Sequence, residues 1–187
     1  MTEEKILIST QQARESLDDI KRTSLRSKIF YEYKQASIYL ILWGIMWFFG
    51  FGLGDLWPKE SGWIWLIVGL IGFILTFTAS LKNDEKFNIM TFVNWGIIGL
   101  GISALFTVIF WILPPITSQQ VGAIISLVMA FMYIIIGFYE GFLYTIAGLA
   151  IICATLIGFF FFYENFGLWM APSAGGSLVL IGLWMRR

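Results

Sequence analysis

Six long apolar segments separated by short polar connectors constrain the fold of this chain more than any other feature. They cover residues 36–53, 63–81, 90–113, 120–138, 142–162 and 167–185. A helix needs roughly 17–25 apolar residues to cross the hydrocarbon core of a bilayer, so each segment is long enough. Because lipid offers no hydrogen bonds, backbone groups there must pair within the helix. We therefore predict an all-α polytopic membrane protein with six transmembrane helices.

Composition and connector length support this prediction and refine it. Hydrophobic residues make up 58% of the 187 residues and charged residues only 13%, about half the share that is usual in soluble domains. Short connectors make sequential helices antiparallel neighbours, so we expect three helical hairpins. The connectors are too short to hold a domain, which leaves two parts: an N-terminal head, 1–35, and a transmembrane bundle, 36–187.

The positive charges indicate the orientation of the bundle. With six spans, every lysine and arginine except Lys59 falls on one side of the membrane: before the first segment, between the second and third, or after the last. Lysine and arginine are retained on the cytoplasmic side. We therefore expect a multi-pass protein with both termini in the cytoplasm.

The head has the composition of a helix. Residues 10–35 contain neither glycine nor proline, and Ala13, Leu17, Ile20 and Ser24 recur at helical spacing, which gives one narrow, weakly apolar face. That face suits docking on the protein's own cytoplasmic surface or on one partner helix. A solvated helical extension of the first span is the alternative.

A basic cluster lies in the second half of the head. Near an anionic leaflet each cation contributes about 1 kcal/mol of attraction, so we expect this membrane-surface cluster to help orient the head on the bilayer. Its members are Lys21, Arg22, Arg26, Lys28 and Lys34.

The polar residues exclude several classes of function. No apolar segment contains Asp, Glu, Lys, Arg or His, whereas proton-coupled pumps and voltage sensors need ionisable groups at membrane depth. The chain has no histidine and a single cysteine, Cys153, so we expect no metal, no cofactor and no enzymatic activity. Its net charge of zero gives no reason to expect a nucleic-acid partner.

The last segment, 167–185, carries the only candidate site. Proline inside a helix removes a backbone hydrogen bond, glycine weakens the helix, and the freed backbone groups must face protein or water. These residues are Pro172, Ser173, Gly175, Gly176 and Ser177. They predict either a shallow pocket or hinge, or a tight crossing where this span packs against a neighbour.

Small residues recur at every fourth position in most of the segments. Such faces let membrane helices approach closely, so we predict interhelix seams there. The sets are Gly72, Thr76, Ser80; Gly99, Ser103, Thr107; Gly122, Ser126, Ala130; and Ala150, Ala154, Gly158. Gly44, Gly96 and Gly148 are also evenly spaced, which leaves open a repeated hairpin or a chance alignment.

Seven tryptophans near the segment ends suggest interfacial anchors. They are Trp57, Trp63, Trp65, Trp95, Trp111, Trp169 and Trp184.

Several stretches resemble an uncharacterised family of small six-span bacterial membrane proteins with a basic N-terminal cytoplasmic helix. They are IKRTSLRSK before the first span, then YLILWGIMWFFGF, GWIWLIVGLIGF and GAIISLVMAFMYIIIGFY, and the ending FGLWMAPSAGGSLVLIGLWMRR. The resemblance implies an inner-membrane location in a prokaryote and supplies no catalytic residues.

Two functions from different classes fit these observations. The first is a non-enzymatic accessory or regulatory subunit that engages a cytoplasmic or membrane protein partner through its N-terminal helix. The second is a carrier or channel for a neutral or apolar small molecule or lipid, with its site around Ser173–Ser177. The lipid bilayer is a partner in both, and homo-oligomerisation stays open.

Overall fold

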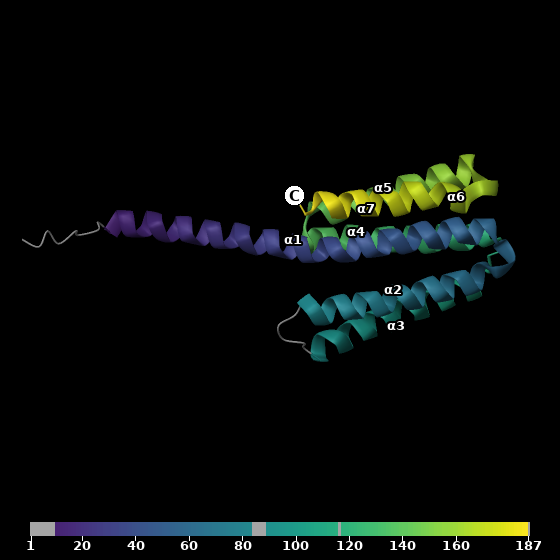
Figure 1. Ribbon diagram of the computed structural model, residues 1–187, viewed down its shortest axis with the longest axis horizontal. Coiled ribbons are helices and arrows are strands. Elements are labelled where there is room, and N and C mark those ends of the chain that lie inside the picture. The colour runs from purple at the N-terminus through teal and green to yellow at the C-terminus, as the bar shows by residue number, and fades with distance from the viewer. Residues whose placement is uncertain (1–9, 84–88, 116, 187) are drawn as a thin grey trace, which may run out of the picture.

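The computed structural model describes residues 10–83, 89–115 and 117–186, and all regular structure among them is helical. Within these ranges, the side chains of residues 10–13, 25–33, 82–83, 89–96, 98 and 140 lie outside the description. The predicted all-α class is confirmed. Long helices lie side by side, and one of them extends far beyond the end of the bundle (Figure 1).

Helix α1, Thr10–Leu56, is continuous over 47 residues. Its apolar part, Lys34–Leu56, lies in the bundle, and the rest projects away from it (Figure 1). Side chains 14–24 are all exposed. The head is therefore a helical extension of the first span with exposed side chains. This is the second of the two arrangements predicted for it, and the docked arrangement is not seen in the described part of the chain. No break marks the boundary at residue 35, so the division into head and bundle stays a prediction.

The remaining elements follow in close succession. They are η1 (Pro58–Glu60), α2 (Ser61–Asn83), α3 (Ile89–Ile112), α4 (Ser118–Glu140), α5 (Phe142–Phe161), η2 (Tyr163–Asn165), α6 (Phe166–Met170), η3 (Ala171–Gly175) and α7 (Gly176–Trp184). A capping box starts α4, with Thr117 and Gln120 bonded reciprocally. Gly141, at φ 129°, makes the turn between α4 and α5 in a conformation that other residues rarely adopt.

Five helical stretches in the described part of the chain are long and apolar enough to cross a membrane. They are Lys34–Leu56, Pro58–Leu81, Ser118–Tyr139, Phe142–Phe161 and Tyr163–Trp184. A shorter apolar stretch, Gly99–Ile112, belongs to α3, whose preceding side chains are largely outside the description. The structure thus has the character of an all-α membrane protein, and the sixth span stays a prediction.

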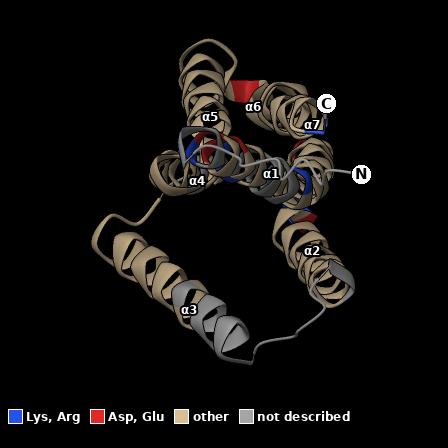
Figure 2. Ribbon diagram, turned by 90° about the vertical axis from the view of Figure 1, so that its left-hand side faces the viewer, with Lys and Arg blue, Asp and Glu red and all other residues tan. Residues whose placement is uncertain are grey.

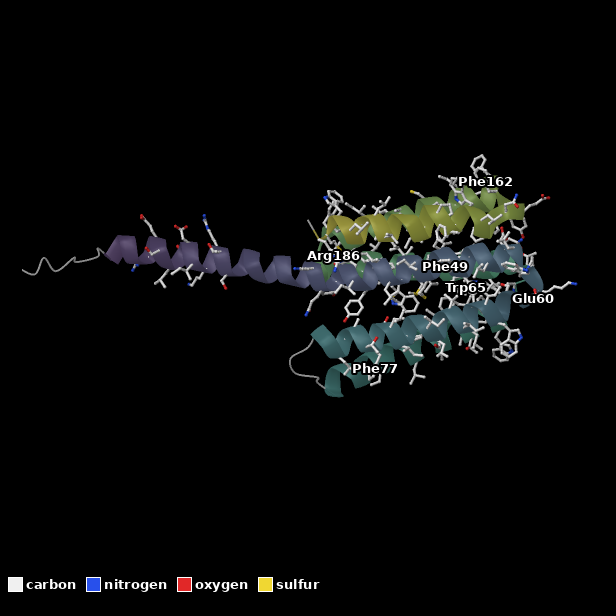
Figure 3. The ribbon with its side chains drawn as sticks, viewed as in Figure 1. Phe49, Glu60, Trp65, Phe77, Phe162 and Arg186 are labelled. Carbon is white, nitrogen blue, oxygen red and sulfur yellow. The ribbon has the colours of Figure 1, made fainter. Side chains whose placement is uncertain are left out.

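The core forms where α1 packs against α6, η3 and α7, and where α4 packs against α5. Leu40, Ile151, Phe166, Met170 and Leu178 are almost fully buried. Helix α2 covers another side of α1, and Figure 3 labels Trp65 between the two helices. The Trp65 ring meets the Phe51 ring of α1 edge-on, with ring centroids 4.9 Å apart. Figure 3 also places Glu60 and Arg186 at opposite ends of the bundle.

Helix α3 stands apart from this core (Figure 2). It makes no extensive contact with another helix in the described part of the chain. Ser103 and Thr107 are exposed and donate hydrogen bonds to carbonyl oxygens of their own helix, each at 2.9 Å. A Cβ added at Gly99 would meet nothing within 4 Å. The predicted seam at Gly99, Ser103 and Thr107 is therefore wrong, because no helix in the described part of the chain packs closely against these residues.

The other predicted seams are confirmed at their glycines. An added Cβ would touch Trp43 and Met46 at Gly72, Phe166 and Phe51 at Gly122, and Trp169 at Gly158.

The tryptophans predicted as interfacial anchors fall into an exposed group and a packed group. Trp63 and Trp111 are exposed near helix ends, as predicted, whereas Trp65 and Trp169 pack against the core, because a facing glycine leaves room for each ring.

Candidate functional site: the π-helical turn of the last span

The last predicted span is interrupted by a turn of π-helix. Helix α6 ends at Met170, η3 forms the wider turn over Ala171–Gly175, and α7 continues from Gly176. Pro172 has no N–H to donate to the preceding turn, which explains why the regular ladder fails here. Turns of this kind are rare in proteins and are frequent at functional sites.

Two serine hydroxyls bond to the backbone around this turn. The Ser173 Oγ donates to the carbonyl oxygen of Trp169 at 2.6 Å, and the Ser177 Oγ donates to that of Ala174 at 2.9 Å. In lipid a carbonyl without a partner is costly, and serine and threonine hydroxyls are one means of pairing it. The two serines therefore help to stabilise an irregular helix at membrane depth.

The buried side of the turn makes a backbone-to-backbone crossing with α1. A Cβ on Gly175 would lie 2.7 Å from the backbone nitrogen of Phe48 and 2.8 Å from the carbonyl oxygen of Gly44. A Cβ on Gly44 would in turn lie 2.8 Å from the carbonyl oxygen of Gly175. Neither helix can accept a larger residue at this point without moving away. We call this contact the glycine crossing.

The crossing continues along the whole of the last span. On the head side, a Cβ on Gly182 would lie 2.7 Å from Ile41 Cγ1. At the other end, a Cβ on Gly167 would lie 2.6 Å from the carbonyl oxygen of Phe51. Glycine thus recurs at three close contacts between the last span and α1. Close packing of this kind is the main source of association between helices in lipid.

Trp169 fixes the other side of α6 to α5. Its Nε1 donates to the carbonyl oxygen of Ala154 at 2.9 Å, and its ring stacks on Phe162 with centroids 4.5 Å apart and an interplanar angle of 7°. A Cβ on Gly158 would lie only 2.5 Å from Trp169 Cδ1. Gly158 therefore provides the space in which the indole lies against α5.

Asp55 ties the end of α1 to the start of α6. Its Oδ2 accepts a hydrogen bond from the backbone N–H of Leu168 at 3.0 Å. The first N–H groups of a helix have no partner within the helix, and a carboxylate there also meets the positive end of the helix dipole. An acidic residue in the last turn of α1 thus acts as a helix cap from 113 residues away in sequence.

The five predicted site residues lie on different faces of this turn. Gly175 is buried in the crossing, Ser173, Gly176 and Ser177 are half-buried, and Pro172 is exposed. Gly176 has open space around its Cα, since an added Cβ would meet nothing within 4 Å. One segment therefore contains both a tight crossing and an open edge, and the use of that edge as a pocket or hinge stays a prediction.

A shallow hollow of about 320 Å³ lies beside this open edge. Its walls are Phe48, Phe49 and Ile45 of α1 with Val179 and Leu180 of α7, together with Gly175 and Gly176. The lining side chains are entirely hydrocarbon, so the hollow can accept an apolar group and offers no acid, base or nucleophile.

The basic cluster lies along the projecting part of α1. Lys21, Arg22 and Lys34 are exposed, whereas the side chains of Arg26 and Lys28 lie outside the described residues. Along a straight helix Lys21 lies about 20 Å beyond Lys34, at 1.5 Å per residue. In this conformation only the end of the cluster near Lys34 is close to the apolar part, and contact of the rest with a bilayer stays a prediction.

Sequence reasoning missed the cap formed by Asp55, and it assigned Trp169 to the membrane interface, whereas the structure packs Trp169 against Gly158 and the core. The Ala154–Gly158 spacing did predict a seam, but nothing local indicated an indole as its partner.

Among the described residues, no three His, Cys, Asp or Glu side chains are grouped so that they could hold a metal ion. No protein family, curated protein or solved structure was found to match this chain.

Proposed function

We propose that this chain is a non-enzymatic inner-membrane protein of bacterial type that serves as an accessory or regulatory subunit. Six spans would form three antiparallel hairpins with both termini in the cytoplasm. The support is the five apolar helices of spanning length, the cations gathered in the head and at the C-terminus, and segments without ionisable residues. A partner protein would bind the N-terminal helix.

One observation carries the proposal: the head is the same helix as the first span. Helix α1 has no break between Thr10 and Leu56, and its inner part packs against α2, α6, η3 and α7. A movement of the head on binding a partner would therefore be transmitted along α1 to the centre of the bundle. Such a connection is what a regulatory subunit needs to transmit binding across the membrane surface.

The head also presents an apolar strip on which none of the described residues packs. Leu17 is 56% exposed and Ile20 is 64% exposed, and the two lie on one face of the helix. Charged residues surround them, including Asp18 and Arg22 on the opposite face. A helix of this kind binds an apolar groove or another helix through the few residues of its narrow face.

The test is co-purification from membranes of the native host with two matched double variants. Leu17→Ser with Ile20→Ser removes the apolar strip. Asp18→Ser with Arg22→Ser changes the opposite face and leaves the net charge unchanged. We expect the first pair to lose a partner that the wild type and the second pair retain. If removal of residues 1–35 leaves the set of co-purified proteins unchanged, the proposal is wrong.

A carrier or channel for a neutral or apolar small molecule or lipid is the second candidate. The hollow beside Gly175 and Gly176 favours it, because its lining is entirely apolar. Solute flux into liposomes tests it with Gly176→Leu, which fills the open edge, whereas a leucine at Gly175 would force α1 and η3 apart. Flux that Gly176→Leu leaves unchanged would exclude this site.

A further inference from the structure

A second and larger hollow lies at the end of the bundle farthest from the head. It has a volume of about 470 Å³ and is partly open to the surroundings. Three elements enclose it: the end of α3 with the turn at Pro114, the first half of α4, and the last half of α5. Leu127, Leu156 and Phe160 are among its walls, so most of the lining is hydrocarbon.

One hydrogen-bonding side chain, Gln120, lines the outer end of this hollow, and two others, Thr117 and Tyr163, lie beside it without lining it. Gln120 lines it and forms the capping box with Thr117, at 3.3 and 3.4 Å. The Thr117 hydroxyl lies 2.7 Å from the hydroxyl of Tyr163, whose ring contacts Phe159 of the lining. Seven residues further along α4, about 10 Å at 1.5 Å per residue, Leu127 lies at the hydrocarbon end.

The deeper end offers one polar side chain that is already bonded. Thr155 is 1% exposed, and its Oγ1 donates to the carbonyl oxygen of Ile151 at 2.7 Å. The hollow thus runs from neutral polar groups near the bundle end to hydrocarbon inside. Its lining contains no charged side chain.

We propose that this hollow binds one acyl chain of a membrane phospholipid, with the ester group near Gln120 and the hydrocarbon toward Leu127 and Leu156. The order of polarity matches that of a lipid entering from the bilayer surface, where ester groups lie outside the hydrocarbon. Binding sites of about 300–1,000 Å³ with apolar walls and a few polar groups at one end are typical of small-molecule ligands.

The order of polarity favours an acyl chain over a partner helix as the occupant, because the lining runs from the amide of Gln120 to the hydrocarbon of Leu127 and Leu156. The walls come from three separate elements, which distinguishes a chain bound here from lipid that lies along a single helix. Since α3 makes no other extensive contact in the described part of the chain, the acyl chain joins the end of α3 to α4 and α5.

The experiment adds phosphatidylcholine with a photoreactive diazirine on one acyl chain to the detergent-solubilised full chain. Labelled residues are mapped by mass spectrometry at increasing lipid concentration. We expect labelling around Leu127 and Leu156 that saturates near one lipid per chain. Leu156→Trp fills the hollow and should lower the saturable labelling at least about tenfold, as an affinity loss of 1.4 kcal/mol would.

The matched control is Leu149→Trp, on the same face of α5 two turns earlier. Leu149 is 50% exposed and Leu156 is 44% exposed, but only Leu156 lines the hollow. We expect Leu149→Trp to retain the saturable labelling. Labelling of the wild type that rises without saturation, or falls equally in the two variants, would overturn the proposal. The wild-type titration decides even if Leu156→Trp does not fold, and neither measurement depends on a partner of the head.

Discussion

Gly175 and Gly176 offer a matched pair of substitutions that tests the glycine crossing. They are adjacent, and both have ordinary helical backbone angles, φ −62° and ψ −46° against φ −63° and ψ −41°. Alanine is therefore compatible with the backbone at either position. The surroundings differ: an added Cβ would lie 2.7 Å from the Phe48 nitrogen at Gly175, whereas at Gly176 it would meet nothing within 4 Å.

The expected effects have opposite signs. In Gly175→Ala the contacted atoms belong to the backbone of α1, so the two helices must separate, and overpacking of this kind costs about 1–3 kcal/mol. For a chain of this length, 1 kcal/mol shifts the melting temperature by about 2–4 °C, which gives a decrease of about 2–12 °C. Gly176→Ala should raise the melting temperature by about 1–4 °C, because alanine is favoured over glycine in a helix by about 0.5–1 kcal/mol.

The measurement is thermal unfolding of each variant in the same detergent, followed by circular dichroism. A double variant, Gly44→Ala with Gly175→Ala, should cost less than the sum of the single changes, since one separation of α1 from η3 relieves both. Equal melting temperatures for Gly175→Ala and Gly176→Ala would refute the crossing. So would an additive double variant, because the two glycines would then not share one contact.

Three further changes test the contacts around the crossing and the packing of α4 against α5 by the same melting assay. Asp55→Ala removes the cap on α6 and should cost about 0.5–2 kcal/mol, whereas Glu60→Ala, at an exposed side chain in the nearby η1, should cost nothing measurable. Trp169→Phe keeps a stacked ring but loses the hydrogen bond to α5, with an expected cost of about 0.5–1.5 kcal/mol. Gly148→Ala places a Cβ 2.5 Å from a carbonyl oxygen of α4 and should be clearly destabilising, whereas Gly101→Ala, with open space around it, should not. A stable Gly148→Ala variant would contradict the α4–α5 packing.

The evenly spaced glycines show how much of the helix packing a sequence pattern can predict. Gly44 meets the carbonyl oxygen of Gly175 and the side chain of Val179, and Gly148 meets the carbonyl oxygen of Ala130 and the side chain of Ile134. Both are points where a glycine lies on the backbone of another helix, as the small-residue pattern suggests. The side-chain surroundings of Gly96, however, lie outside the described residues, so the three-hairpin repeat stays a prediction.

The sequence by itself determined the helices. Blocks of about twenty apolar residues can satisfy their backbone only within a helix, and the connectors and caps set where each helix ends. Pro172 and the glycines after it predicted a weakened last span, and the structure has a π-helical turn there. Small residues at every fourth position also predicted where helices approach, because side chains four apart share a face.

Only the tertiary structure decided which faces meet. Residues far apart in sequence supply each contact: Asp55 caps Leu168, and Gly44 meets Gly175. The same small-residue pattern lies buried on α5 and open on α3. Small residues on one face of a helix show that another helix could pack closely there. Which helix does so depends on how all the helices pack together. The two hollows are what that packing leaves unfilled, and no local feature of the chain could have located them.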